Sequence, residues 1–164
     1  MKHPCIVSSL WLAMALVLAP SPLRAAGPYG LAADNKISAQ GIVNALMREH
    51  PELVSAGIHC VRPGSPGQTI VASTLNVIGK PSDPPDIDVG QHGETIISPS
   101  SKAPKLGVML PLKDSRGREI GALALAFHYR AGDDQTKAFL LATSIRDALA
   151  PSIPSLESLF LVAL

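Results

Sequence analysis

The chain has 164 residues, with 14 Lys and Arg against 13 Asp and Glu, so its formal net charge is +1. This length allows one domain with a tail rather than two full domains, and the balanced charge excludes a nucleic-acid-binding protein with a basic stripe and a protein with a polyanionic tail. The hydrophobic content of 46% is sufficient for a core, while 15 Pro and 13 Gly are scattered without a repeat, which excludes collagen-like and low-complexity sequences.

The first 26 residues have the order of a secretory signal peptide. A short basic start precedes an apolar run at residues 6–19, and prolines and small residues follow it. Because a membrane-spanning helix needs about 20 apolar residues, we expect a cleaved signal at residues 1–26 rather than a permanent anchor. The mature protein would then be periplasmic or secreted and would have no membrane span.

Cleavage at this place would change the charge and the cysteine content. It removes Lys2 and Arg24, which leaves 12 basic and 13 acidic residues, and it removes Cys5. Cys60 then has no partner for an internal disulfide, so the fold is expected to depend on its core. We interpret Cys60 as a small buried hydrophobic residue rather than a reactive thiol.

The first half of the mature chain predicts a helix followed by a hairpin. Residues 36–50 have apolar positions on one helical face, with Ser38 as the expected N-cap, and Pro51 ends the helix. Residues 57–62 and 68–74 have strand-like composition and flank a Pro- and Gly-rich turn, so they are predicted to pair.

Residues 75–101 are predicted to form a long irregular crossing. This segment contains four prolines and four acids, with one helical turn expected near 85–89 and a short strand at 94–97. Long loops of this kind in compact domains are usually functional or disordered. Apolar residues spaced along the segment predict that it packs on the core.

The second half predicts a hairpin and a helix. Residues 105–113 and 118–130 alternate in hydrophobicity and flank a turn in which Gly117 suits the left-handed conformation. One face of the longer strand is rich in alanine, which allows close approach of either a helix or a ligand. Residues 135–150 have a helical apolar stripe with acids at the N-terminal end, and residues 151–164 form an apolar tail.

Two segments resemble the extracytoplasmic Cache family of sensor domains, also called PDC domains. The stretch VMLPLKDSRGREIGALALAF at residues 108–127 is similar to the closing hairpin of that family, and TIVASTLNVIGKPS at residues 69–82 is similar to the segment between its second and third strands. The resemblance implies an α+β, PAS-like fold over residues 36–150. That fold has about five antiparallel strands flanked by an N-terminal and a C-terminal helix, and a small-molecule cavity on the other side of the sheet.

The chain departs from the family in two ways. Family members are usually tethered to a signalling module by transmembrane helices, and this chain resembles a free, secreted unit without one. The aromatic and Asp pattern of amine- and amino-acid-binding members is not matched, so the resemblance does not imply amino-acid binding.

The predicted cavity lies between the central strands and the 75–101 crossing. Ligand sites combine a mostly apolar cleft with a few polar groups. Lys105 is suited to an anionic ligand, whereas Asp83 and Asp86 would either meet a ligand amine or cap the short helix, and capping is the preferred interpretation. The candidate ligand-binding residues are Ser73, Thr74, Asn76, Asp83, Asp86, His92, Lys105 and Met109.

No catalytic or metal motif is found. The chain has no nucleophile elbow, phosphate-binding loop or dinucleotide-binding motif, so we expect a protein that is not an enzyme. His59 and Cys60 are adjacent and would face opposite sides of a strand, which disfavours a shared metal site. No cofactor is predicted.

Three functions follow from the sequence. The preferred one is an exported small-molecule-binding module that serves as a sensor-like or carrier partner of a membrane-bound receptor or transporter. The second is an accessory or structural secreted protein with a filled cavity, which docks on a partner protein through its apolar tail. The third is a haem- or metal-associated exported protein that uses His92 or His128.

Overall fold

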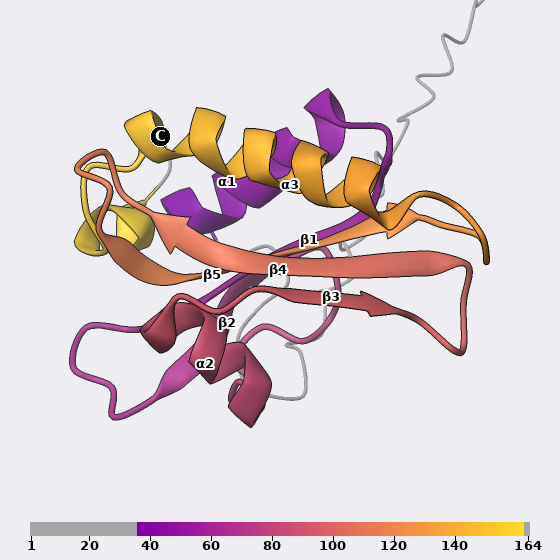
Figure 1. Ribbon diagram of the computed structural model, residues 1–164. Helices are drawn as coiled ribbons and strands as arrows, with labels where there is room; N and C mark the ends of the chain where they lie inside the picture. Colours follow the sequence, from indigo (N-terminus) through magenta and orange to yellow (C-terminus); the bar gives the residue numbers. More distant parts are fainter. Residues whose placement is uncertain (1–35, 163–164) are drawn as a thin grey trace, which may run out of the picture.

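The computed structural model describes residues 36–162, which are built on one antiparallel sheet. Helices α1 (Ser38–Glu49) and α3 (Gln135–Leu149) cover one face of this sheet, and α2 (Pro84–His92) lies on the other face (Figure 1). The predicted α+β, PAS-like arrangement of about five strands with two flanking helices is confirmed. The strand order is β2-β1-β5-β4-β3, with β1 (Leu53–Val61), β2 (Gln68–Ser73), β3 (Ile96–Pro99), β4 (Lys105–Lys113) and β5 (Glu119–His128).

The core lies between the sheet and the layer formed by α1 and α3. Successive side chains on a strand point to opposite faces, so alternate residues of β4 and β5 face these helices and pack with their apolar stripes. Burying these residues is the main favourable contribution to folding. The buried set includes Val43, Leu46, Leu106, Val108, Leu110, Leu112, Leu123, Leu125, Phe127, Ala142 and Ile145.

Both predicted hairpins form, but β1 is longer than expected. It begins at Leu53 rather than at residue 57, and a register shift separates Leu53 from Ser55 where it pairs with β5. Residues 53–56 have no regular alternation of apolar and polar positions, and the strand extends over them where it pairs with β5. β3 begins two residues later than the expected strand at 94–97, because its pairing partners are Met109 to Leu106 of β4.

Two of the predicted helix starts are corrected. Ser38 is the first residue of α1 and Ile37 occupies the N-cap position without a side-chain hydrogen bond. The α2 helix spans nine residues rather than one turn, and Asp83 at its N-cap makes no capping hydrogen bond. At α3, in contrast, the carboxylate of Asp134 accepts a hydrogen bond from the Thr136 N–H at 2.8 Å, which satisfies one donor of the first helical turn.

The β4–β5 turn is held by Asp114. Gly117 has a φ of +76°, the left-handed conformation that glycine adopts without a Cβ penalty. The Asp114 carboxylate accepts hydrogen bonds from the Arg116 and Arg118 N–H groups, both at 2.9 Å, and from the Arg118 side chain at 2.7 Å. Burial opposes ionisation of Asp114, but these hydrogen bonds outweigh it and lower the pKa of its carboxyl.

The C-terminal segment packs beside α1. Two short 3-10 helices, Ala150–Ser152 and Glu157–Phe160, bring Ile153 and Leu159 into the core. The Ser38 N–H donates to the Leu161 carbonyl at 2.7 Å, and the Arg62 guanidinium lies 5.1 Å from the centre of the Phe160 ring. The two ends of the described chain are therefore joined.

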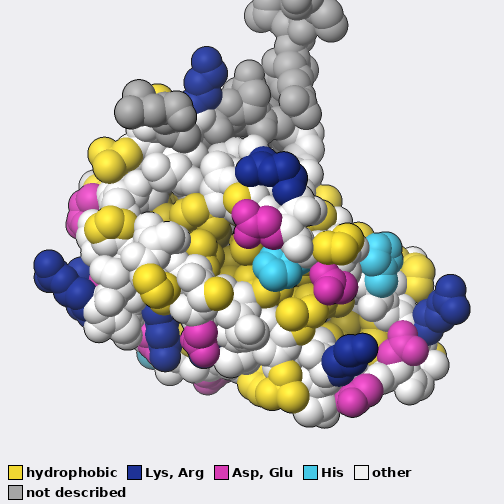
Figure 2. All heavy atoms as spheres, turned by 90° about the horizontal axis from the view of Figure 1, so that it is seen from above, with side chains coloured by type: hydrophobic (Ala, Val, Ile, Leu, Met, Phe, Trp, Pro, Cys, Tyr) yellow, Lys and Arg dark blue, Asp and Glu magenta, His cyan; other side chains and the backbone are white. Residues whose placement is uncertain are grey.

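Charged groups are dispersed over one face of the molecule. On the face that is uppermost in Figure 1, Lys and Arg side chains alternate with Asp and Glu, and hydrophobic side chains emerge between them (Figure 2). Among residues 36–162, no helix has the length and apolar character needed to cross a membrane.

Candidate functional site

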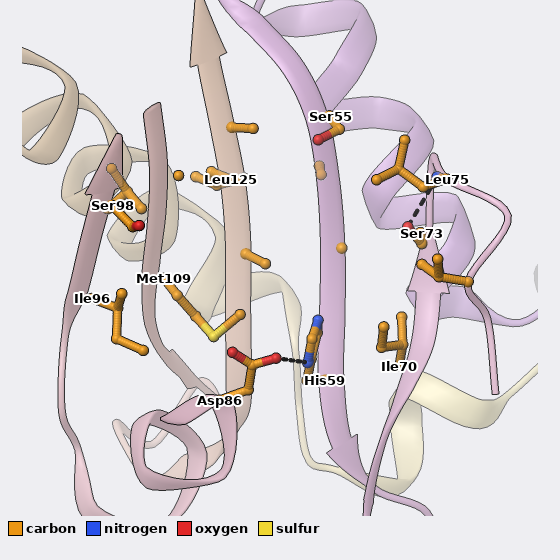
Figure 3. A pocket seen from close by; sticks show the side chains of 17 residues that line it. Ser55, His59, Ile70, Ser73, Leu75, Asp86, Ile96, Ser98, Met109 and Leu125 are labelled. Atoms are coloured by element: carbon orange, nitrogen blue, oxygen red, sulfur yellow. Dashed lines mark hydrogen bonds and ion pairs between the residues drawn. The ribbon is translucent and has the colours of Figure 1, made fainter. Parts of the chain in front are cut away.

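A cavity of about 310 Å³ lies against the sheet on the side of α2. This volume is within the range of small-molecule sites, about 300–1,000 Å³. Most of its lining is apolar, with polar side chains at its ends (Figure 3). The lining residues are Ser55, Ala56, Gly57, His59, Ile70, Ser73, Leu75, Val77, Asp86, Ile96, Ser98, Gly107, Val108, Met109, Ala124, Leu125 and Ala126.

The strand register explains why this part of the sheet is hollow. Ser98, Gly107, Ala126 and Ser55 form one row across four strands, because each is paired with the next. The following row is Ile96, Met109, Ala124, Gly57 and Ser73. The middle of both rows contains glycine and alanine, so their side chains do not fill the space beneath the crossing. The alanine-rich face predicted for β5 therefore has two roles. It lines the cavity, and α2 packs on the same strand.

The polar end of the cavity is formed by His59 and Asp86, and Ser82 contacts His59 beside it. His59 comes from β1 and Asp86 from the first turn of α2, and their side chains point toward one another (Figure 3). The Nδ1 atom of His59 lies 3.1 Å from the Ser82 hydroxyl and 3.5 Å from Asp86 Oδ2. The first distance is that of a hydrogen bond, and the second is long for one.

Burial favours the neutral form of His59. Its side chain is 7% exposed, and loss of hydration lowers the pKa of the imidazole, although Asp86 and Asp83 act in the opposite direction. Asp86 is 24% exposed and lies at the edge of the cavity. The site therefore combines an imidazole whose neutral form is favoured with a carboxylate that water reaches.

This cluster does not have the geometry of a serine nucleophile with its base. In a Ser-His-Asp relay the hydroxyl and the carboxylate contact different nitrogens of the imidazole. Here Ser82 and Asp86 both approach Nδ1 of His59. The arrangement is suited to hydrogen bonding with a bound molecule.

Cys60 lies on the other side of the strand from His59. Its side chain is buried in the core, and burial raises the pKa of its thiol to about 12. The predicted opposite orientation of His59 and Cys60 is confirmed. A thiol with this pKa is protonated at neutral pH and is a poor nucleophile.

Gln68 attaches α2 to the sheet beside the site. The Gln68 side-chain amide donates a hydrogen bond to the Asp86 carbonyl at 2.8 Å. A Cβ on Gly90 would overlap with the Gln68 side-chain oxygen, so glycine permits this close approach. These contacts hold the helix that carries Asp86 close to β2.

The structure brings three of the eight predicted ligand-binding residues to the cavity. They are Ser73 at the end of β2, Asp86 on α2 and Met109 on β4. The preferred interpretation of Asp86 as a helix cap is wrong, since Asp83 occupies the N-cap and Asp86 faces His59. Ser73 also has a structural role, because its hydroxyl accepts a hydrogen bond from the Leu75 N–H at 3.0 Å.

The other five predicted residues do not line this cavity. Thr74 bonds to the backbone of Ala56 at the end of the β1–β2 pairing, and Asn76 is exposed in the following turn. The remaining three lie outside the lining. Asp83 pairs with Lys80 at 3.4 Å, His92 pairs with Asp88 at 3.2 Å, and Lys105 starts β4 opposite His128.

Sequence reasoning missed His59 as a site residue. The sequence pattern associates His59 only with a metal site shared with Cys60, which it disfavours. Its neighbours in the site, Ser82 and Asp86, lie more than 20 positions away in the chain, so local patterns do not connect them. The signal that was available is alternation, because Ser55, Gly57 and His59 occupy alternate positions of one strand.

The described residues contain no group of three or more His, Cys, Asp and Glu side chains arranged to bind a metal ion. His92 and His128, the residues considered for haem or metal, are both exposed and belong to α2 and the end of β5.

No protein-family model matches this sequence, and a search of curated proteins finds no match. Three solved structures illustrate its similarity to known folds. A type II free methionine-R-sulfoxide reductase from Thermoplasma acidophilum is 16% identical with a TM-score of 0.43, over 76% of this chain and 93% of that one. A protein described as a GAF sensor from Burkholderia vietnamiensis is 14% identical with a TM-score of 0.47, over 73% and 76%.

The third is the inducer-binding domain of the PobR transcription factor from Acinetobacter, in complex with 3-hydroxybenzoic acid. It is 12% identical with a TM-score of 0.44, over 70% of this chain and 97% of that domain. At these values the similarity assigns neither a family nor a residue role to this chain.

Proposed function

We propose that this protein is an exported small-molecule-binding module of the Cache type, which acts as a sensor-like or carrier partner of a membrane-bound receptor or transporter. The observation that supports binding most directly is the cavity of about 310 Å³ with its polar end at His59 and Asp86. Export and the Cache assignment rest on the signal-like order of residues 1–26 and on the motifs at residues 69–82 and 108–127.

The cavity is suited to binding because its floor is part of the rigid sheet. Gly107, Ala124 and Ala126 belong to β4 and β5, which are paired along their length. A preformed apolar site reduces the ordering cost of binding.

The test is thermal melting of the purified protein against a library of amino acids, amines, carboxylates, purines and divalent metals. A ligand present at 100 times its dissociation constant adds about 2.7 kcal/mol of stability, so a true ligand raises the melting temperature by several degrees. Absence of any shift across the library would contradict the binding function and favour an accessory protein with an unused cavity.

A cavity-filling substitution tests whether the ligand-induced shift in melting temperature comes from binding in this cavity. We expect Ala124→Leu to leave the protein folded and to abolish the ligand-induced shift, because the larger side chain enters the cavity from its floor. The matched control is Ala131→Leu, an exposed position outside the cavity, which should retain the full shift. Equal ligand shifts in both variants would place binding elsewhere.

Export is tested separately. The N-terminal sequence of the protein recovered from the periplasm or medium should begin near residue 27. Recovery of the intact N-terminus from the cytosol would contradict export without affecting the proposal of ligand binding.

A further inference from the structure

The cavity places one carboxylate at its polar end without a cationic side chain to balance it. Among the described residues that line the cavity, none is Lys or Arg, and Asp86 is the one acidic residue. Its partner His59 is buried and its pKa is lowered. The nearby Lys80 is paired with Asp83 at 3.4 Å, so those two charges offset each other and Asp86 carries the net negative charge of this end.

Asp86 also has hydrogen-bonding capacity that His59 does not use. An ionised carboxylate accepts about four hydrogen bonds, while a neutral imidazole has a single N–H. If that proton is on Nε2 of His59, then Nδ1 accepts from the Ser82 hydroxyl at 3.1 Å and gives nothing to Asp86. If the proton is on Nδ1, it supplies at most one hydrogen bond, over 3.5 Å. In both tautomers Asp86 keeps free acceptor positions.

The rest of the cavity determines the body of the ligand. Beyond Asp86, apolar side chains of Ile70, Leu75, Val77, Ile96 and Met109 surround the alanine and glycine floor. With about 30 Å³ for each water-sized group, the cavity of about 310 Å³ holds roughly ten non-hydrogen atoms. The serine hydroxyls at the other end are neutral and offer no counter-charge to a carboxylate (Figure 3).

We infer that the ligand is a small organic amine with an apolar body of about this size and no carboxylate, whose protonated nitrogen donates hydrogen bonds to Asp86. This inference rests on the proposed binding function and specifies its ligand class. The ammonium group lies at the partly hydrated edge of the cavity, and the apolar body lies over Ala124 and Gly107. An amino acid is disfavoured because its carboxylate would meet no cation among the lining residues.

The test uses four probes with one phenyl skeleton. The probes are 2-phenylethylamine, 2-phenylethanol, 3-phenylpropanoate and L-phenylalanine, each measured by thermal melting and by titration calorimetry on the purified protein. We expect 2-phenylethylamine to bind most tightly, the alcohol about tenfold more weakly, and the two carboxylates least, since one charge-assisted hydrogen bond is worth about that factor.

Two variants identify the residue responsible. Asp86→Asn should weaken the amine about tenfold or more and leave the alcohol nearly unchanged. Asp83→Asn is the matched control, because it removes a carboxylate three residues earlier, at the exposed N-cap of the same helix and outside the cavity. It should change the affinity of the amine by less than about threefold, because water and salt screen an exposed charge. Melting of both variants without ligand verifies that they are folded.

Several outcomes overturn the inference while the binding function stands. They are tighter binding of a carboxylate than of the amine, equal binding of amine and alcohol, or unchanged amine affinity in Asp86→Asn. If none of the four binds but the broader library yields a ligand, an organic amine whose affinity is weakened by Asp86→Asn supports the inference, and a metal ion or a neutral or anionic ligand contradicts it. If no compound of either set binds, the proposed function itself fails.

Discussion

At the scale of single residues, His59 shows how burial changes the role of an ordinary side chain. The imidazole is buried against Ser82 and Asp86 at the end of the cavity. Loss of hydration disfavours its charged form more than the neighbouring carboxylates favour it, so the pKa of His59 is below 6.5. A neutral His59 can accept or donate a hydrogen bond near neutral pH.

This lowered pKa makes folding depend on pH. Between the folded-state pKa and about 6.5, the unfolded chain binds a proton that the native protein does not. Stability is therefore full above pH 6.5 and decreases as the pH falls below it. We expect the unfolding free energy of the wild type, measured with urea from pH 8 to pH 5, to fall more steeply than that of His59→Gln. The same substitution at exposed His128 should leave the wild-type slope unchanged, and parallel curves for His59→Gln would contradict this account.

Gly121 is the second residue with a specific requirement. A Cβ at this position would overlap with the His59 carbonyl oxygen and the Cys60 Cβ on the neighbouring strand. We expect Gly121→Ala to lower the unfolding free energy by about 1–3 kcal/mol, the usual cost of overpacking. Gly67→Ala is the control, since nothing lies within 4 Å of the added carbon, and it should change stability by less than about 0.5 kcal/mol. Equal losses in urea unfolding would disprove the steric explanation.

At the scale of elements, Gln40 connects the helix layer to the edge of the sheet. Its side-chain oxygen accepts a hydrogen bond from the Ser73 N–H at 3.0 Å, and its amide donates to the Ser73 carbonyl at 3.2 Å. One side chain of α1 therefore satisfies both backbone groups at the end of β2. Because Ser73 also lines the cavity, this contact joins the ligand side of the sheet to the helix side.

Removing this connection should be costly. Gln40→Ala leaves the buried N–H and carbonyl of Ser73 without these partners, and we expect a loss of about 1–3 kcal/mol in urea unfolding. Asn44→Ala removes only the exposed partner of the Gln40 amide, 3.0 Å away, and should be neutral or slightly stabilising because alanine favours helix. A loss in Gln40→Ala no larger than in Asn44→Ala would show that water replaces the contact.

At the scale of the whole molecule, the C-terminal segment completes the core rather than extending from it. Leu159 is 1% exposed, whereas Leu161, two residues later, is 62% exposed. The segment is also bonded to the start of α1 through Ser38 and Leu161. Some apolar residues of this segment are therefore buried in the core, and others are exposed on the surface.

The two leucines provide a matched comparison. Leu159→Ala should lower the unfolding free energy by about 2–5 kcal/mol, because it opens a cavity in the core. Leu161→Ala should change it by less than about 0.5 kcal/mol. If thermal melting shows similar values for both variants, the segment does not pack on the domain in solution.

Local sequence was a sound guide to the elements. The strand at residues 105–113 was predicted with its observed bounds, and the second hairpin and the last helix lie within two residues of expectation. Regular alternation and clear turn residues make the secondary structure of these segments predictable from the sequence. The start of β1 was not predicted, because residues 53–56 lack regular alternation, and the strand extends over them where it pairs with β5.

The residues on the cavity side of the sheet were also partly predictable from the sequence. Met109 was a candidate, and the alanine face of β5 was recognised as a place of close approach. Five of the eight candidates lie elsewhere, because the path of the crossing over the sheet cannot be derived from composition. Lys105, for example, was expected to contact an anionic ligand, yet it lies at the end of the sheet opposite His128.

The sequence by itself determined the types of most elements, the two hairpins and the separation of a helix-facing side from a small-residue side of the sheet. These features depend on periodicity and turn chemistry, which act over a few residues. The tertiary structure alone decided that Asp86 meets His59, that Ser82 joins them and that Asp83 does not. That outcome depends on the packing of α2, held by Gln68, against strands distant in the chain. Local patterns carry no information on such long-range packing, and it is this packing that forms the site.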